Sequence, residues 1–431
     1  MLIEFRVENF GSIKEEQVLS LVASNYYKDL PDNVFDPDLP GLSGVKLLKG
    51  AAIYGPNASG KSTLIKAMGT LQQLVIQSAM RGPEAPLPQR PFCLDEASCA
   101  APTSFFVAFV QAGVRYEYEL SYTAKRVLRE SLTAFPKKIG QLWFERVWDA
   151  THSVYEWRRP GALKVSSELL EMVRENALFL SVGAHFNNPQ LGGVREWFTQ
   201  SLKVLNLGAD ANVNALDPGF SAELVKGSSH LRERLLDLLR HADLGVVSAD
   251  VVQAPPEAPT AMLEALGKFL QPEVLAEVAR TGATMQSIKL GHQTPSSIVP
   301  IDFAEESAGT QRLFALAGPW LDILEHGYTV FIDELDASLH PVLIQALLGV
   351  LFSPQTNPLG AQVVFTTHNP YLLAAEILRR DQIWFTEKDG GGATHLYPLS
   401  DYKPRPKESL ISGYLAGRYG AVPMIPPGMG I

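Results

Sequence analysis

The chain has 431 residues, enough for two or three compact domains or for one domain with a large insertion. Apolar residues make up 46% of it, which excludes a disordered chain, and a net charge of −9 argues against a surface coated with basic residues for nucleic acid. Its two cysteines, Cys93 and Cys99, match no zinc pattern and are expected to be reduced, semi-buried thiols. The N-terminus is unlike a signal peptide, and no apolar run approaches about 18 residues, so we expect a soluble, cytoplasmic protein without membrane spans.

The first part of the chain predicts a β-rich region around one strand–loop–helix unit. Residues 2–8 alternate between apolar and charged side chains and predict a strand that ends at the turn of residues 9–11. Residues 45–54 predict a nearly continuous apolar strand, and the apolar residues of 64–75 recur at helical spacing. Residues 103–122 alternate again and predict a β-hairpin.

A phosphate-binding loop joins that apolar strand to that helix. The stretch "GPNASGKS" meets the pattern G-x-x-x-x-G-K-[ST] in full, and its backbone N–H groups and the helix N-terminus are suited to binding phosphate oxygens. We expect Lys61 to reach the β- and γ-phosphates of ATP and Ser62 to bind Mg²⁺. The predicted nucleotide-binding residues here are Gly55, Asn57, Ser59, Gly60, Lys61, Ser62 and Thr63.

The middle of the chain has a different pattern, in which leucines recur at helical spacing between turns rich in glycine, asparagine and proline. Residues 253–261 ("QAPPEAPTA") predict a connector without an ordered element. From about residue 300 the alternation of strands and helices returns. We therefore predict an ATPase core whose halves are 1–160 and 301–431, with a mainly helical insertion lobe at 161–300.

Two buried strands in the last part end in residues suited to phosphate chemistry. The strand "YTVFID" ends at Asp333 and Glu334, and the strand "AQVVFTTH" ends at His368. The carboxyl ends of such strands are where α/β sheets bind ligands, so Asp333 is expected to hold Mg²⁺ and Glu334 to polarise the attacking water. His368 either contacts the γ-phosphate or the lytic water, or has a structural role. A hairpin over 382–399, with its turn at residues 389–392, is predicted to follow.

The stretch "EESAGTQRLF" (305–314) precedes an apolar helix that Pro319 is expected to interrupt. By itself, S-x-G-x-Q predicts only a helix N-cap. In the order phosphate loop, helical insertion, "SAGTQ", "FIDE", "DASLH" and "TTH", it resembles the signature motif of ABC-type ATPases. The whole order resembles the ATPase head shared by SMC, RecF and OLD-type proteins. With the terminal "GRYGAVP", it most resembles the AAA-15 group of OLD-like ATPases of bacterial phage-defence and abortive-infection systems, including RloA-like proteins.

This resemblance implies an α/β fold, namely an ABC/SMC-type P-loop ATPase head with a β-rich N-terminal part and a mainly helical insertion. It also implies a homodimer that sandwiches two ATP molecules, in which Ser307, Gly309 and Gln311 of each subunit cap the γ-phosphate held by the other. Asp336 matches the D-loop, which communicates across such a dimer. Gln89 is a candidate for the Q-loop glutamine, with an ordinary polar loop residue as the alternative.

OLD nucleases continue into a metal-binding nuclease domain, whereas this sequence ends about 60 residues past His368. The resemblance thus implies an ATPase that acts as sensor and scaffold for a separate effector nuclease or toxin, with no nuclease activity of its own. The alternatives are a RecF- or SMC-like DNA-maintenance ATPase that binds DNA directly and a platform that rarely hydrolyses its nucleotide. The basic, tyrosine-containing tail (Lys403, Arg405, Lys407, Arg418) could contact nucleic acid, could contact a companion protein, or could simply be packed.

Overall fold

The structure is a computed structural model that describes residues 1–39, 41–206, 218–227, 229–242, 245–253, 286–337, 339–405 and 408–423. It divides into two compact units. The first unit consists of Met1–Ala215, Ile323–Ala337 and Ile344–Ile431, and the second of Leu216–Asp322 and Ser338–Leu343. The division at 160 and 300 drawn from the sequence stays a prediction.

The first unit contains a six-stranded sheet that carries the phosphate loop, in the order β11-β15-β16-β5-β17-β18. Its strands are β11 (Leu202–Asn206), β15 (Thr329–Asp333), β16 (Gln362–Thr366), β5 (Gly50–Tyr54), β17 (Ile383–Lys388) and β18 (Thr394–Pro398). The first five are parallel and β18 is antiparallel to β17. Because the carboxyl ends of parallel strands meet at one edge, β5, β15 and β16 bring three predicted site segments together.

A second sheet of this unit is antiparallel, in the order β10-β9-β8-β7-β6-β1-β2. Its strands are β1 (Leu2–Glu8), β2 (Gln17–Ser20), β6 (Thr103–Gln111), β7 (Val114–Tyr122), β8 (Val127–Phe135), β9 (Gln141–Asp149) and β10 (Val154–Arg158). The predicted first strand and the predicted hairpin over 103–122 are confirmed by β1, β6 and β7.

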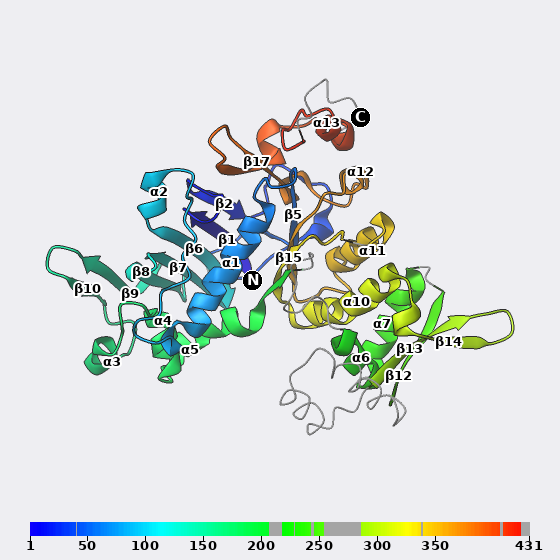
Figure 1. The fold of residues 1–431 in the computed structure, drawn as a ribbon, viewed down its shortest axis with the longest axis horizontal. Helices are drawn as coiled ribbons and strands as arrows, with labels where there is room; N and C mark the ends of the chain where they lie inside the picture. Colours follow the sequence, from blue (N-terminus) through cyan, green and yellow to red (C-terminus); the bar gives the residue numbers. More distant parts are fainter. Residues whose placement is uncertain are drawn as a thin grey trace, which may run out of the picture. The chain divides into compact units, whose positions relative to one another are not determined.

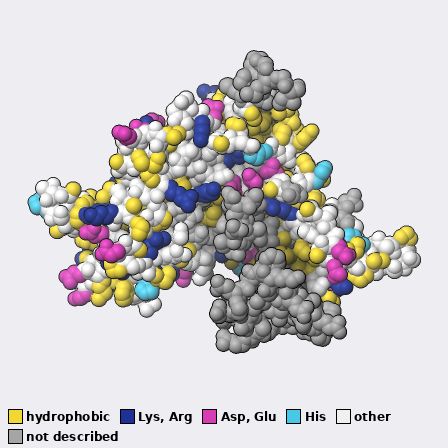
Figure 2. Space-filling model, viewed as in Figure 1, with side chains coloured by type: hydrophobic (Ala, Val, Ile, Leu, Met, Phe, Trp, Pro, Cys, Tyr) yellow, Lys and Arg dark blue, Asp and Glu magenta, His cyan; other side chains and the backbone are white. Residues whose placement is uncertain are grey.

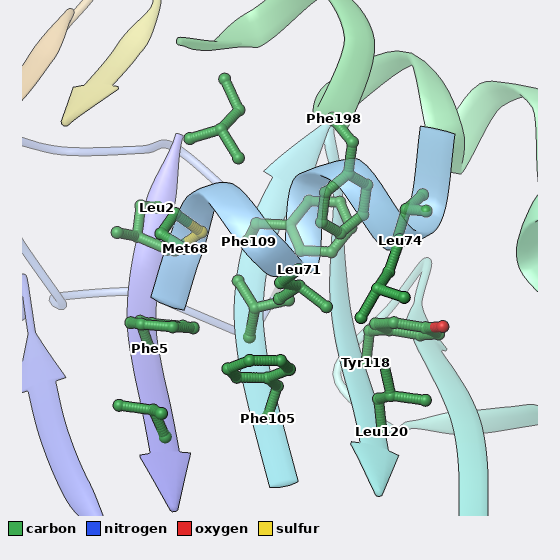
Figure 3. Packing of buried hydrophobic residues seen from close by; sticks show 14 of the residues in the cluster. Leu2, Phe5, Met68, Leu71, Leu74, Phe105, Phe109, Tyr118, Leu120 and Phe198 are labelled. Atoms are coloured by element: carbon green, nitrogen blue, oxygen red, sulfur yellow. The ribbon is translucent and has the colours of Figure 1, made fainter. Parts of the chain in front are cut away.

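Helix α1 (Lys61–Gln77) packs its apolar side against the antiparallel sheet. Figure 3 shows Met68, Leu71 and Leu74 of this helix lying over Phe5 and Phe109 of the sheet. Because one side of α1 is fixed in this way, the start of the helix is held at the end of the phosphate loop.

Smaller elements complete the first unit, where β3 and β4 form a two-stranded ladder and Figure 1 shows the short helices at its periphery. These elements are β3 (Val34–Phe35), β4 (Leu47–Leu48), α2 (Glu96–Ala100), α3 (Ser167–Glu171), α4 (Phe179–His185), α5 (Pro189–Glu196), α12 (Tyr371–Ala374) and α13 (Leu410–Leu415). Helix α11 (Pro341–Phe352) begins in the second unit and continues into the first, and Pro341 stands at its first position, as predicted.

The second unit contains a three-stranded antiparallel sheet and most of helix α10 (Ala308–His326). Its other described elements are β12 (Val246–Gln253), β13 (Gln286–Gln293), β14 (Ile298–Asp302), α6 (Pro218–Lys226) and α7 (Ser229–His241). The Ser221 hydroxyl of α6 donates to Phe314 O at 2.6 Å and accepts from Gly318 N at 3.0 Å. A Cβ at Gly318 would lie 2.8 Å from Ser221 Cα, so glycine is needed for this close approach.

Several expectations differ from the structure. The strand predicted over 45–54 is divided at Lys49 into β4, which pairs with β3, and β5, which pairs with β16. The buried Lys49 ammonium donates to Phe352 O at 2.8 Å. Helix α10 runs through Pro319 without interruption, so the predicted break is wrong. The range 161–300 also contributes strands, including β11 to the parallel sheet. Most of the proline-rich connector at 253–261 lies outside the described residues.

None of the helices within the described part of the chain combines the length and the apolar character needed to cross a membrane.

Candidate nucleotide site

The phosphate loop is the turn between β5 and α1, and two of its glycines leave no room for a side chain. Gly60 has φ of 108°, and a Cβ there would lie 2.2 Å from Thr394 Oγ1. A Cβ at Gly55 would lie 2.5 Å from the backbone oxygen of Thr386. The β17–β18 hairpin therefore lies directly against the loop, and only glycine fits at both positions.

Lys61 bends back over the loop that it follows. Its ammonium donates to Gly55 O at 2.8 Å and to Pro56 O at 3.0 Å. Burial lowers the pKa of Lys61 to about 8, while the nearby carboxylates of Asp333 and Glu334 act in the opposite direction. The charge that would meet the phosphates is thus held at the mouth of the loop by weak neutral acceptors, which phosphate oxygens can replace.

The other predicted loop residues have distinct surroundings. Asn57 is exposed and Ser62 is half-buried. The buried Ser59 hydroxyl pairs with Thr386 Oγ1 at 2.7 Å, and Thr63 Oγ1 lies 3.1 Å from Ser12 Oγ. The Ser59 and Thr63 side chains therefore hold the loop in place, and Ser62 offers the hydroxyl best suited to a metal ion.

Asp333 ends β15, Glu334 follows it, and both are held by one hydroxyl from the neighbouring strand. Thr366 Oγ1 donates to Asp333 Oδ1 at 2.7 Å and accepts from the Glu334 backbone N–H at 2.7 Å. Glu334 takes a positive φ of 56°, a conformation that costs a non-glycine residue energy and that recurs at functional sites. Strand β16 lies between β15 and β5, so Thr366 at its end is placed between the Asp333–Glu334 pair and the phosphate loop.

His368 and Asp336 meet at the same edge of the sheet. The His368 backbone N–H donates to Asp336 Oδ2 at 3.1 Å, and Asp336 Oδ1 is buried without a hydrogen-bond partner among the described residues. Partial burial, and then the charge of Lys61, lower the pKa of His368, so its ring is neutral at pH 7. Asp333, Glu334 and Asp336 each act electrostatically on both Lys61 and His368, so these five predicted residues lie close together at this edge of the sheet.

The signature segment lies in the second unit, before and in the first turn of α10. Ser307 is exposed and caps the helix, because its hydroxyl accepts from Thr310 N at 3.1 Å. The Gln311 amide donates back to Phe303 O at 2.8 Å. Gly309, between them, is half-buried. These contacts are all local, so the segment is a stable helix start with an exposed serine.

A comparison with protein-family models identifies the family of the chain. The model described as "AAA domain, putative AbiEii toxin, Type IV TA system" matches residues 51–374, about three quarters of the chain. The chain belongs to this AAA family. The match extends from β5 through His368, so it includes the phosphate loop and the two strand ends at which catalytic residues are predicted.

Solved structures give a weaker likeness for this AAA-family chain. It is similar to the SMC head domain from Thermotoga maritima, with 12% identity, coverage of 92% of this chain and 98% of that chain, and a TM-score of 0.39. It is also similar to an SMC head bound to the C-winged helix domain of ScpA, with 12% identity, coverage of 93% and 99%, and a TM-score of 0.40. No curated protein gives a significant match to the sequence.

The predicted α/β P-loop ATPase head is confirmed by the family and by the sheet order, and the family is one of nucleotide-binding ATPases. The finer OLD-like and RloA-like subtype stays a prediction. The residues also fit the groups that such an ATPase uses. Ser62 and Asp333 offer the hydroxyl and carboxylate oxygens that Mg²⁺ prefers, and the loop with Lys61 offers donors for a triphosphate.

Sequence analysis missed the residues of this AAA-family chain that hold the phosphate loop from outside. Thr394 Oγ1 lies 2.9 Å from Ser59 O and 2.8 Å from Ser12 Oγ, and Ser12 in turn reaches Thr63. With Thr386, these hydroxyls form a chain from the N-terminal turn to the C-terminal hairpin. No short sequence motif could identify these threonines, because their partners Ser12 and Ser59 lie more than 300 residues away in sequence.

Gln89 and the tail also have clear structural roles. The Gln89 side chain bonds the backbone at Ala101 and Ala124, which favours the polar-loop alternative. In the tail, Tyr414 and Tyr419 are buried, and Tyr414 packs on Tyr54 at the end of β5 with ring centroids 5.7 Å apart. Lys407 lies outside the described residues. On the face in view, the described Lys and Arg side chains are mixed with acidic and apolar ones (Figure 2).

Proposed function

We propose that this chain is a Mg²⁺-dependent ATPase that dimerises around ATP and acts as sensor and scaffold, switching a separate nuclease or toxin in bacterial anti-phage defence. The observation that carries the proposal is that the residues predicted to act on ATP lie together, whereas the signature segment belongs to the other compact unit. The phosphate loop, Glu334 and His368 lie close together and interact electrostatically, while Ser307 is exposed at a helix start, where its hydroxyl bonds to Thr310.

Each residue of the coupled site has a definite task in hydrolysis. Lys61 leaves its two carbonyl acceptors and binds the β- and γ-phosphate oxygens, where its charge opposes the charge that develops in the transition state. Mg²⁺, when bound by Ser62 and Asp333, supplies further positive charge to the same oxygens. Glu334 orients and polarises the attacking water, and the neutral His368 ring offers one hydrogen bond to the γ-phosphate or to that water.

The signature supplies the remaining part from a second subunit. Ser307, Gly309 and the partial positive charge at the start of α10 are suited to the γ-phosphate. Among the residues that the structure describes, the Ser307 hydroxyl bonds only to Thr310 of its own helix start, so an anion bound there would displace no long-range contact of this hydroxyl within that part of the chain. ATP thus holds two subunits together, and its hydrolysis lets the dimer dissociate. Asp336, which has one buried oxygen without a hydrogen-bond partner among the described residues, would contact the partner subunit, as its match to the D-loop implies.

The defence role rests on two further points. The description of the matching family refers to an AbiEii toxin and to a type IV toxin–antitoxin system. The terminal "GRYGAVP" resembles the OLD-like group of phage-defence ATPases. Both support a chain that works beside a toxic effector, and the ATP-dependent dimer is the switch that would act on it.

The test is Glu334→Gln. Because the amide cannot accept a proton from water, we expect this variant to bind ATP, to hydrolyse it at least about 100-fold more slowly, and to accumulate as a closed dimer with Mg²⁺. Light scattering coupled to size exclusion measures the dimer, and phosphate release measures turnover. Glu171→Gln, at an exposed acid of α3, is the matched control and should behave as wild type.

If Glu334→Gln and the wild type both stay monomeric with saturating ATP and Mg²⁺, the sandwich is wrong. The effector part is tested by expressing the chain with its neighbouring genes and analysing the purified complex by mass spectrometry. We expect a nuclease or toxin to co-purify with the chain. The ATP concentration at which this companion dissociates should differ between Glu334→Gln and wild type. The absence of any companion, together with ATP- and salt-dependent DNA binding, would instead favour a DNA-maintenance ATPase.

A further inference from the structure

The two cysteines of the chain are neighbours on its surface. Cys93 lies two residues before Asp95, the N-cap of α2, and Cys99 lies within that helix. Their sulfur atoms are 2.9 Å apart and both residues are exposed, so the expectation of semi-buried thiols is wrong. The sequence contains no third cysteine, and each thiol therefore has a single partner within the chain.

Noncovalent contacts already close the segment that holds these thiols. The Asp95 carboxylate accepts from Ser98 N at 3.1 Å and from Ser98 Oγ at 2.6 Å, between the two cysteines. Asn9 binds both ends of the segment, because its Oδ1 accepts from Phe92 N at 2.9 Å and its Nδ2 donates to Ser98 O at 2.8 Å. Folding therefore brings the two thiols together before any bond forms between them.

We propose that Cys93 and Cys99 form a redox-modification site, a dithiol that becomes an intramolecular disulfide by exchange with a small-molecule disulfide such as glutathione disulfide. The thiolate of one cysteine attacks a glutathione sulfur and releases one glutathione. The second cysteine thiolate then attacks the protein sulfur of this mixed disulfide and releases the other. The two protein thiols lose two electrons, which reduce glutathione disulfide, and their two protons end on the released glutathione thiols.

The geometry favours this second step. A disulfide needs its sulfurs about 2.0 Å apart, so the pair needs less than about 1 Å of approach, and exposure admits the small-molecule disulfide. Holding two reacting groups side by side makes the closing step effectively intramolecular, which favours ring closure over a lasting mixed disulfide. The inference does not depend on the proposed function.

The modified segment is joined to the nucleotide site. Gly11 N donates to Arg90 O at 2.6 Å, and a Cβ on Gly11 would lie 2.8 Å from Thr63 Cγ2 at the start of α1. Asn9 of the same turn donates directly to Ser98 O within the cysteine segment, so oxidation would fix a segment that touches the turn beside the phosphate loop.

The experiment titrates the folded full-length protein with glutathione disulfide at fixed total glutathione and measures intact mass after acid quenching. Wild type should lose about 2 Da, with no retained glutathione, as the disulfide forms. Cys93→Ser and Cys99→Ser should each instead gain one glutathione. We expect half-oxidation of wild type to need at least about 10-fold less glutathione disulfide than half-modification of either single variant. Retained glutathione on wild type, or no difference from the single variants, would overturn the proposal.

A second pair of variants tests whether the folded segment positions the thiols. Asp95→Ala removes the side chain that closes the turn and should raise the glutathione disulfide needed for half-oxidation several-fold. Glu96→Ala changes the adjacent exposed acid, for which the structure shows no side-chain hydrogen bond, and should titrate as wild type. Circular dichroism checks that both variants are folded. Equal titration of Asp95→Ala and Glu96→Ala would show that the observed closeness is not what drives the disulfide.

Discussion

The phosphate loop and the signature segment are both helix starts suited to an anion, yet they are held in different ways. Gly55 to Lys61 is fixed by hydroxyls and strands from both ends of the chain, through Thr386 and Thr394 of the hairpin. Ser307 is held by its own helix start. Rigid support suits a site that must place reacting atoms, whereas local support suits a surface that must meet a partner.

The electrostatics of the two regions differ in the same sense. Lys61 is buried, its pKa is lowered, and it faces three acidic residues. Around Ser307, the nearest strong interaction is the pairing of Glu306 with His292 at 2.5 Å within the second unit. This difference is in line with the proposal that the first region carries out chemistry on a phosphate and the second recognises a phosphate supplied by a partner subunit. This difference gives four tests.

The largest effect should come from removing one region in each of two variants. Lys61→Ala removes the charge that would bind the phosphates. Ser307→Arg places a large side chain at the helix start, where it would occupy the space of the partner's phosphate. We expect each to reduce ATP turnover at least about 100-fold, with single-subunit ATP binding retained only in Ser307→Arg. Phosphate release and fluorescent-nucleotide binding measure the two quantities, and Lys66→Ala, at an exposed lysine of α1, is the control.

Mixing the two inactive variants sharpens this comparison. A mixed dimer joins the intact phosphate loop of Ser307→Arg to the intact signature of Lys61→Ala at one of its two sites. Each mixed dimer has one complete site, so equal mixing should raise ATP turnover clearly above the sum of the two variants measured alone. A mixture that gains no activity, at protein concentrations at which the wild type dimerises with ATP, would mean that the two regions do not complete one another across subunits.

A smaller effect should follow from weakening the support of the phosphate loop. Thr394→Val keeps the shape of the side chain but leaves Ser59 O, which is buried by the hairpin, without this donor. We expect a loss of about 1–3 kcal/mol in the free energy of unfolding and about 10-fold weaker ATP binding. Thr70→Val is the control, because the Thr70 hydroxyl bonds only to Lys66 O of its own helix. Unchanged ATP affinity in a destabilised Thr394→Val would restrict this hydroxyl to a role in folding.

Local patterns predicted the parts of this site that are local. The strand–loop–helix around Lys61, the strand ending at Asp333 and the hairpin predicted over 382–399 all follow from short runs of apolar residues and turn residues. The strand β11 was missed because five residues beside helical segments carry too little periodicity to separate them from those segments. The supporting hydroxyls were missed because a threonine in a strand has the same sequence pattern whether or not a distant loop packs on it.

The smallest effect concerns the proton on Lys61. Its pKa in the free protein is about 8, below the 10.5 of an unhindered lysine, because burial disfavours the charged form. The unfolded chain therefore binds more protons between pH 8 and 10.5, so the contribution of Lys61 to the free energy of unfolding becomes more favourable as the pH rises through this window. ATP binding has the opposite trend, because a triphosphate favours the charged lysine and raises its pKa.

At pH 8 about half of the lysine is neutral, and ATP binding should take up about half a proton per site. Calorimetry of ATP binding in two buffers with different ionisation enthalpies measures this number. Lys61→Arg, which stays charged at every accessible pH, should bind ATP without the uptake. If wild type also takes up no proton at pH 8, the ammonium is already fully charged in the free loop. Its carbonyl contacts and the three nearby acids would then outweigh its burial, and the phosphate loop would carry its positive charge as permanently as the signature helix carries its dipole.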